Sequence, residues 1–150
     1  MPLRTDWSER LCPVDRALDV LGDPWVLMIL RDVMHGRTRF EELKEGLGIS
    51  DPVLVRRLGD LVEAGLLEKR PYQGDGRTRH VYVVTQAGAD ALPILNSLAL
   101  WGEKHTSIPA GGAHMALIHD ACGQESTSAD VCTTCGEPLR AGEMSWDEPW

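Results

Sequence analysis

The strongest constraint on the fold lies between residues 38 and 65, where two short helical patterns are separated by a pair of glycines. Thr38 stands three residues before Glu41, which is the spacing of a capping box, and this predicts a helix that runs through Glu45. Glycines disfavour a helix interior and permit tight turns, so the next residues predict a short turn: Gly46 and Gly48. Two helices joined in this way predict a helix-turn-helix.

The second helix of this pair has an apolar face and a polar face. Ser50 and Asp51 suit an N-cap, Pro52 suits the first helical position, and Gly65 marks the end of the helix. The apolar face is a leucine stripe: Leu54, Leu58 and Leu61. The opposite face and its flanks carry Pro52, Val55, Arg56, Arg57, Gly59 and Glu63. Two arginines close to a capped helix start suit a DNA major groove, so we predict a recognition helix over Pro52–Ala64.

Two β-rich runs follow, over residues 66–71 and 80–84, and they predict a hairpin. The loop between them, residues 72–79, is polar and glycine-rich and carries Arg77 and Arg79. An ordinary solvated hairpin has the same pattern when it stands alone. Next to a helix-turn-helix, a basic tip instead indicates a wing that brings positive charge to phosphates or to a minor groove.

The net charge of −8 runs against nucleic-acid binding, so its distribution along the chain matters. Residues 31–80 hold ten Lys and Arg against nine Asp and Glu, whereas the rest of the chain holds five against fourteen. Acidic charge is therefore concentrated outside the predicted DNA-binding stretch. We expect binding that is modest and strongly salt-sensitive, and a dimer would double the phosphate contacts.

Two further helices are predicted before the helix-turn-helix. Cys12-Pro13 begins the first of them and Gly22 ends it. Asp23 then caps a second helix that has Pro24 at its first position. This second helix is apolar nearly all round, so we expect it to lie in the core.

After the wing, Thr85 predicts the cap of a long helix that continues to Trp101 and bends at Pro93. This helix and the one that begins at Cys12-Pro13 carry more apolar surface than a small core can cover. A subunit interface is therefore expected, and two-fold pairing would present two recognition helices to a palindromic site. The alternative is that the last helix folds back on its own core.

Beyond a proline- and glycine-containing linker, residues 105–116, the chain carries H-x2-C and C-x2-C spacings separated by nine residues. Each spacing is followed by a glycine, which relaxes a turn that lets two side chains reach one tetrahedral metal. We predict one structural zinc with four ligands: His119, Cys122, Cys132 and Cys135. A knuckle without metal, a redox dithiol at Cys132 and Cys135, and a flexible tail are the alternatives.

We expect the linker to separate this site from the wing, so that zinc stabilises the tail without gating DNA binding. The acidic end of the chain, residues 143–150, is expected to be mobile.

The chain resembles the HxlR-type winged-helix transcriptional regulators of bacteria and archaea over roughly residues 10–104. The residues that carry the resemblance are Cys12-Pro13-Val14, Gly22, Trp25, Leu27–Arg31, Phe40-Glu41-Glu42-Leu43, Gly48-Ile49-Ser50, Leu54, Arg57-Leu58, Leu61, Glu63-Ala64-Gly65-Leu66, Tyr82, Thr85, Gly88, Leu95 and Trp101-Gly102. The cysteine-bearing tail resembles one found on some members only. Where the family usually has a Ser-Pro-Asn type sequence, the recognition helix here begins with Ser50-Asp51-Pro52.

This resemblance implies a homodimer, joined through the first and last helices of the core, that binds a palindromic operator. It also implies a thiol-sensing role for Cys12 and an electrophile or small molecule as effector. The residues themselves leave two readings of Cys12, a thiolate favoured by a helix start or a buried, inert cysteine. Asp51 and Val55 suit a cytosine amine and a thymine methyl, and they equally suit capping and packing.

Together these features predict an α+β fold: a winged helix-turn-helix, mainly α with a two-stranded β-wing, plus a small C-terminal zinc-ribbon-like extension. We predict three regions: residues 10–104 for DNA binding and dimerisation, 105–116 as linker, and 117–150 as the Cys/His tail. The residues predicted to bind DNA are Arg39, Ser50, Asp51, Pro52, Val55, Arg56, Arg57, Arg77 and Arg79.

The predicted function is a dimeric, sequence-specific DNA-binding regulator, with repression favoured. A winged-helix module that binds proteins without sequence-specific DNA binding is the alternative. An enzyme is not expected, because the five histidines are scattered and no nucleophile–base spacing or phosphate-binding loop is present. The sequence has no apolar run of about 20 residues and no apolar signal-peptide core at its start, so we expect a cytoplasmic protein with reduced thiols.

Overall fold

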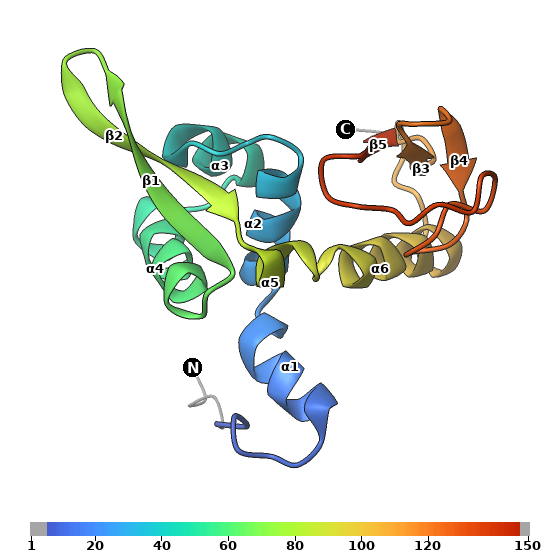
Figure 1. Ribbon diagram of the computed structural model, residues 1–150, viewed down its shortest axis with the longest axis horizontal. Helices are drawn as coiled ribbons and strands as arrows, with labels where there is room; N and C mark the ends of the chain where they lie inside the picture. The colour runs from blue at the N-terminus through green and yellow to red at the C-terminus, as the bar shows by residue number, and fades with distance from the viewer. Residues whose placement is uncertain (1–5, 148–150) are drawn as a thin grey trace.

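The computed structural model describes residues 6–147 and has a winged-helix unit with a small sheet packed at its side (Figure 1). Its elements, in order, are α1 (Pro13–Leu21), α2 (Pro24–Met34), α3 (Phe40–Leu47), α4 (Asp51–Glu63), β1 (Leu67–Gly74), β2 (Arg77–Val84), α5 (Gln86–Ala89), α6 (Leu92–His105), β3 (Ala116–His119), β4 (Gln124–Ser126) and β5 (Met144–Asp147). The predicted winged helix-turn-helix with a two-stranded wing is confirmed, and so is an extension that brings the Cys/His cluster together.

The first helix of the helix-turn-helix, α3, begins one residue later than predicted, with Arg39 rather than Thr38 at the N-cap. The carboxylate of Glu42, rather than that of Glu41, accepts the backbone N–H groups of Thr38 and Arg39, at 3.1 and 3.0 Å. The helix also runs through Gly46 and ends at Gly48, whose φ of +62° suits a residue without a side chain. The prediction that both glycines break the helix was wrong for the first of them.

The second helix, α4, follows the sequence pattern closely. Ser50 stands at the N-cap without a side-chain capping bond, and Pro52 lies in the first turn. The leucine stripe is confirmed, because Leu54, Leu58 and Leu61 are all buried against the core. The exposed side of α4 is thereby set, and it is the side that carries the predicted DNA contacts.

The wing is a longer and tighter hairpin than predicted. Strands β1 and β2 pair antiparallel over eight residues each, from Leu67 opposite Val84 to Gly74 opposite Arg77. The loop predicted over residues 72–79 shrinks to a two-residue turn, Asp75-Gly76, with φ of 50° and 73°. An Asp-Gly pair suits such a turn, so a signal in the sequence was passed over. The N–H of Tyr82 also donates to the carbonyl of Thr38 at 2.8 Å, which ties the wing to the start of α3.

The helix predicted from Thr85 to Trp101 is two helices. Thr85 caps the short helix α5, where its hydroxyl oxygen accepts the N–H of Gly88 at 3.1 Å. Gly88 lies so close to β1 that a Cβ there would come within 2.2 Å of the Leu66 carbonyl oxygen. Pro93 lies in the first turn of α6, so it starts a new helix rather than bending an old one.

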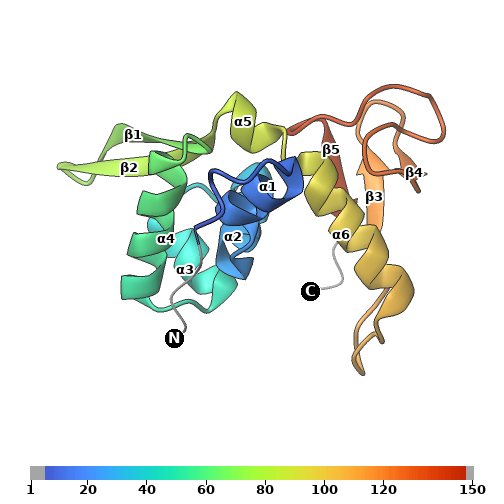
Figure 2. The same ribbon diagram turned by 90° about the horizontal axis from the view of Figure 1, so that it is seen from below.

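The tail forms a three-stranded sheet in the order β4-β3-β5, and Figure 2 shows it lying alongside α6. The prediction that residues 143–150 are mobile was wrong for its described part, because Met144–Asp147 is strand β5 and the side chains of Met144 and Trp146 are buried. Residues 148–150 lie outside the described residues. A run of buried apolar side chains therefore continues from the winged helix into the tail.

Helix α1 stands apart from this core. Among the described residues none of its nine side chains is buried, whereas α2 buries Val26, Ile29, Leu30 and Val33. In Figure 1 it extends away from the wing and the tail sheet alike. Within residues 6–147, no helix is long and apolar enough to cross a membrane.

Candidate nucleic-acid interface and metal centre

The solvent-facing side of α4 carries several of the residues predicted to bind DNA. Pro52, Val55 and Arg56 are all exposed, and the side chain of Val55 is 60% exposed. Exposure of an apolar side chain beside an arginine gives this face both a hydrogen-bond donor and a methyl-sized apolar contact. Those are the two kinds of group that distinguish base pairs in a major groove.

Arg57 lies differently from its neighbour Arg56. Its guanidinium forms ion pairs with Asp23 at 2.5 Å and with Asp60 at 3.2 Å, and only 17% of its side chain is exposed. Arg57 was predicted to reach into the major groove, but its guanidinium already donates to two carboxylates. Helix spacing alone placed it on a flank of α4 and could not reveal Asp23, which precedes it by 34 residues.

The turn before α4 is braced by an ion pair between its two flanking helices. The Nζ of Lys44 lies 2.8 Å from Oδ1 of Asp51. The hydrogen bond that Lys44 donates to the Asp51 carboxylate, and then the negative charge of Asp51, raise the pKa of Lys44 above its ordinary value. Asp51 thus contacts α3, while Ser50 beside it is exposed. This contact uses one of the two acceptor oxygens of the Asp51 carboxylate.

A groove of about 610 Å³ lies between the start of α3 and the wing. Its basic lining comprises Arg39, Lys69, Arg77, Arg79 and His80, and Glu41 and Glu42 lie at its other edge. The guanidinium carbon of Arg39 is 5.2 Å from the ring centre of Tyr72, within cation–π range. Lys69, Tyr72 and His80 were not among the predicted DNA contacts, and the antiparallel register places Tyr72 directly opposite Arg79.

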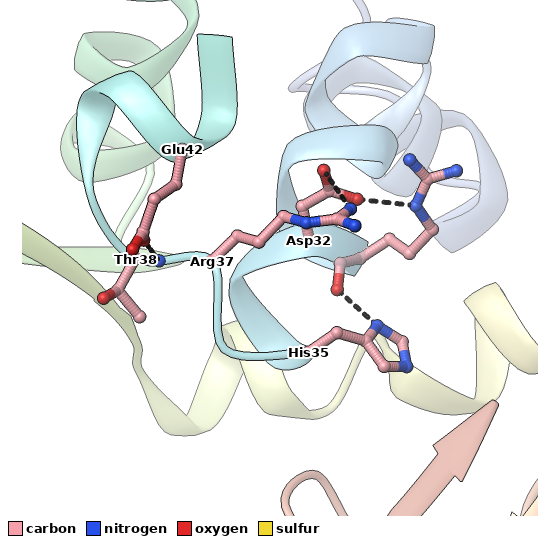
Figure 3. A network of polar contacts seen from close by, with 6 residues as sticks. Asp32, His35, Arg37, Thr38 and Glu42 are labelled. Atoms are coloured by element: carbon pink, nitrogen blue, oxygen red, sulfur yellow. Dashed lines mark hydrogen bonds and ion pairs between the residues drawn. The ribbon is translucent and has the colours of Figure 1, made fainter. Parts of the chain in front are cut away.

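A buried carboxylate positions the segment that leads into α3 (Figure 3). Asp32 is 1% exposed, and its two oxygens lie 2.8 Å from Nε of Arg31 and 3.1 Å from Nη1 of Arg37. The ring of His35 adds a contact of 2.7 Å from its Nδ1 to the carbonyl of Arg31. The sequence analysis did not identify this network, although a single aspartate inside an apolar helix was its visible signal.

The four predicted metal ligands come together. One ligand atom from each of His119, Cys122, Cys132 and Cys135 lies within 4.8 Å of all the others. His119 ends β3, and the other three lie on turns around it. Nδ1 of His119 lies 3.2 Å from the Cys135 sulfur and 3.6 Å from the Cys122 sulfur, and the sulfurs of Cys122 and Cys132 are 3.7 Å apart. Three sulfurs and one imidazole in one cluster are a donor set that suits tetrahedral Zn²⁺.

The backbone around these ligands supports the same chemistry. The glycine after each knuckle has a positive φ, 67° at Gly123 and 79° at Gly136, as the spacing predicted. The backbone N–H of Cys135 donates to the sulfur of Cys132, and with that of Thr134 it lowers the pKa of the Cys132 thiol to about 6. A thiol with such a pKa is largely a thiolate at neutral pH, the form that binds metal.

Cys12 occupies the N-cap of α1 and is exposed in the single chain. The two arginines nearest to it in sequence are engaged elsewhere. Arg16 donates to the carbonyls of Arg10 and Leu11, both at 2.7 Å, and Arg10 pairs with Asp15 at 3.3 Å. The Cys12 thiol therefore lies exposed at the N-terminal end of α1, without a charged side chain of these two arginines directed at it.

The sequence pattern of the family described as HxlR-like helix-turn-helix matches residues 20–109. An uncharacterised HTH-type transcriptional regulator of Mycobacterium tuberculosis is 40% identical over 132 residues, which are 88% of this chain and 82% of that protein. A second one, from Methanothermobacter thermautotrophicus, is 31% identical over 67% of this chain and 76% of its own.

Two solved structures are also similar. The crystal structure of PA1607, a candidate transcription factor, has a TM-score of 0.75 and 34% identity, and the match covers 93% of this chain and 96% of that one. The redox regulator HypR in its oxidised form has a TM-score of 0.59 and 26% identity, over 65% of this chain and all of its own.

The family match spans more than half of the chain and includes the helix-turn-helix, the wing and α6. The chain is therefore a DNA-binding regulator of transcription and not an enzyme, and it belongs to the HxlR-like helix-turn-helix family.

Proposed function

We propose that this regulator binds a palindromic operator as a homodimer and represses the gene beside it. The observation that carries the proposal is that one winged-helix unit presents both an exposed, arginine-bearing face of α4 and a basic groove between the start of α3 and the wing. A helix face can enter the major groove of DNA while basic side chains elsewhere in the protein contact the sugar-phosphate backbone. Such a partner also keeps the protein in the cytoplasm of a bacterial or archaeal cell.

Within this interface we assign different roles to the two adjacent arginines. Arg56 is exposed and reaches the base edges, together with Val55 and the start of α4 at Ser50, Asp51 and Pro52. Arg57 positions α4 through Asp23 and Asp60, and adds positive charge close to the DNA without donating to a base. Arg39, Arg77 and Arg79 contact phosphates or the minor groove.

The dimer is proposed from two exposed apolar faces. On α1 and just before it, Leu11, Val14 and Leu18 are exposed, at 96%, 61% and 47%. On α6, Leu98 and Trp101 are exposed, at 52% and 62%. Burying side chains of this size gains about 1.5–3 kcal/mol each, so pairing of these faces gives a strong drive to dimerise. A two-fold axis would then present two α4 helices to a palindrome.

Repression is the sign of regulation that we propose, because a dimer seated on a promoter palindrome excludes other proteins from the DNA that it covers. Cys12 is the proposed sensor for a thiol-reactive effector, since it is exposed at the start of α1 and lies at the edge of the proposed dimer face. For the cluster in the tail we propose one structural Zn²⁺, which all four ligands would hold without an open position for catalysis.

The test is a binding titration of the full chain against the DNA upstream of its own gene, at two salt concentrations. We expect tight, sequence-selective binding that weakens as salt rises. Arg56→Ala should reduce the preference for this DNA, and Arg140→Ala serves as its matched control, because Arg140 is an exposed arginine of the tail. Binding that ignores sequence at both salts would overturn the proposal and favour a protein-interaction module.

A further inference from the structure

We propose that metal loading of the Cys/His cluster controls dimerisation, because the metal-held tail docks on the same helix, α6, that carries the proposed dimer face. This inference rests on the proposed function for the dimer, and it adds a regulatory role for the metal. The tail sheet lies over α6 in Figure 1, while the wing lies at the other end of the molecule. Any effect on DNA binding therefore passes through the helices that the tail contacts and not directly through the wing.

The coupling begins at Asn96, a fully buried side chain in the middle of α6. Every hydrogen bond recorded for its amide group goes to the tail. Its Nδ2 donates to the carbonyl of Ala129 at 2.9 Å and contacts the sulfur of Met144 at 3.3 Å, and its Oδ1 accepts from Nε1 of Trp146 at 3.0 Å. A buried amide that loses its partners is destabilising by about 1–3 kcal/mol. Loss of the tail would therefore loosen α6 from within.

Trp146 extends the contact from α6 to α2. Its ring lies 4.5 Å, centre to centre, from the ring of His35 at the C-cap of α2. His35 in turn belongs to the network around Asp32 that Figure 3 shows, which orders the segment leading to α3. Trp146 of the tail thus contacts both α6, at Asn96, and the end of α2, at His35.

The tail needs the metal to hold this position. Its three strands contain four, three and four residues, and its described part, residues 116–147, is too short to bury a sufficient core alone. Its interior includes a ligand, Cys132, packed with Leu117 and Leu139. Zn²⁺ bound by all four ligands would convert the cluster into a cross-link between β3 and two turns.

The opposite side of α6 is the one that the dimer would use. Leu92, Leu95 and Asn96 are buried toward the core and tail, whereas Ile94, Leu98 and Trp101 are exposed. A groove of about 340 Å³ runs between α2, α6 and the tail, with Leu98 on one wall and Trp146 on another. Undocking of the tail would remove that second wall and leave α6 supported on one side only.

The linker was expected to separate the metal site from the wing, and that expectation did not include a contact between the tail and α6. Residues 106–115 do lack helices and strands, but the chain beyond them returns to α6 and does not swing free. Glu103 on α6 accepts the backbone N–H of Met115 at 3.4 Å, which holds the end of this segment against the helix. The tail is therefore separated from α6 by a linker in the sequence but contacts α6 in the fold.

The test uses the full chain in three states: zinc-loaded, treated with a chelator, and returned to zinc. Amide hydrogen exchange followed by mass spectrometry reports on α6 and the tail, and analytical ultracentrifugation reports on dimerisation. We expect removal of zinc to speed amide exchange over Leu92–His105 and to raise the dissociation constant of the dimer about 10-fold, which is within the usual range of allosteric coupling. Return of zinc should reverse both changes.

Two variants separate this role from a general loss of folding. Cys122→Ser should reproduce the chelated state, whereas Glu137→Gln, an exposed carboxylate next to the cluster, should behave like the wild type. Asn96→Ala should keep the metal and yet show fast exchange in α6 even when it is loaded. Unchanged exchange in α6 and an unchanged dimer after zinc removal would overturn the inference, as would failure of zinc to bind.

Neither readout involves DNA. If neither loaded nor metal-free protein binds DNA, the proposed function fails while the exchange and dimer results still decide the role of the metal. If DNA binding holds and α6 ignores the metal, this inference alone is lost.

Discussion

Arg57 of α4 and Asp23 at the N-cap of α2 form an ion pair of 2.5 Å in which each side chain is less than one-fifth exposed. The same carboxylate caps α2, because its Oδ1 accepts the N–H of Trp25 at 2.9 Å. Asp23 thus connects the start of α2 to α4. It also follows directly after Gly22, the C-cap of α1, so the ion pair ties α4 to the chain directly after the end of α1 in the sequence.

The first prediction concerns this ion pair. Arg57→Ala should lower the free energy of unfolding by about 1–3 kcal/mol, because it leaves a largely buried Asp23 carboxylate without its cation. Urea unfolding monitored by circular dichroism measures the change. Arg56→Ala, one residue away and exposed, should change stability by less than about 0.5 kcal/mol. Equal stability of the two variants would contradict the assignment of Arg57 as a positioning residue.

The second prediction concerns base recognition. Arg56→Ala should weaken binding to the operator by about 1–3 kcal/mol and leave binding to unrelated DNA nearly unchanged, because a base contact is lost and few phosphate contacts are. A fluorescence-anisotropy titration against both DNAs checks this. A parallel loss on both DNAs would show that Arg56 contacts the backbone instead.

The third prediction concerns the wing. Arg77→Ala should lower affinity for all DNA sequences alike and reduce the slope of log K against log salt by about 1 per contact, since a phosphate contact releases a counterion. Titrations at four salt concentrations give the slope. Arg70→Ala is the matched control, because Arg70 lies on β1 outside the groove and pairs with Glu68 at 2.9 Å. The same slope in both variants would exclude Arg77 from the interface.

The fourth prediction concerns dimerisation. Val14→Glu on α1 and Trp101→Glu on α6 should each give monomers, because a carboxylate would be buried in an apolar interface. Sedimentation velocity over a range of protein concentrations measures the shift. Ile108→Glu replaces another exposed apolar residue, one outside both helices, and should remain dimeric. Dimers that survive both helix substitutions would place the interface elsewhere.

Local patterns in the sequence predicted much of the fold. The leucines of α4, the Asp23 cap and the glycine after each knuckle could be read within a window of a few residues, where helix period and turn geometry act directly. The Asp-Gly turn of the wing was equally local and was overlooked. Pro93 was misread because a proline in an apolar run suits a helix start as well as a bend.

The contacts that proved decisive for the site are not local. Asn96 and Trp146 are 50 residues apart, and Arg57 and Asp23 are 34 apart. A single sequence carries no signal that pairs such positions, so a buried amide reads as an exposed residue of a helix and a paired arginine reads as a free one. The Cys/His cluster could be predicted from spacing alone, because each half has two ligands separated by two residues, which is a local pattern typical of zinc sites.

Because α1 buries no side chain in the single chain, its stability would depend on the concentration of the protein if α1 forms the dimer interface. A helix of nine residues that buries none of them in the described structure is shorter than the length at which isolated helices hold together in water. If α1 orders only against a second copy, its folded fraction rises with the number of chains in the cell. Scarce chains would then carry an unstructured N-terminal arm open to proteases, and abundant chains would protect one another.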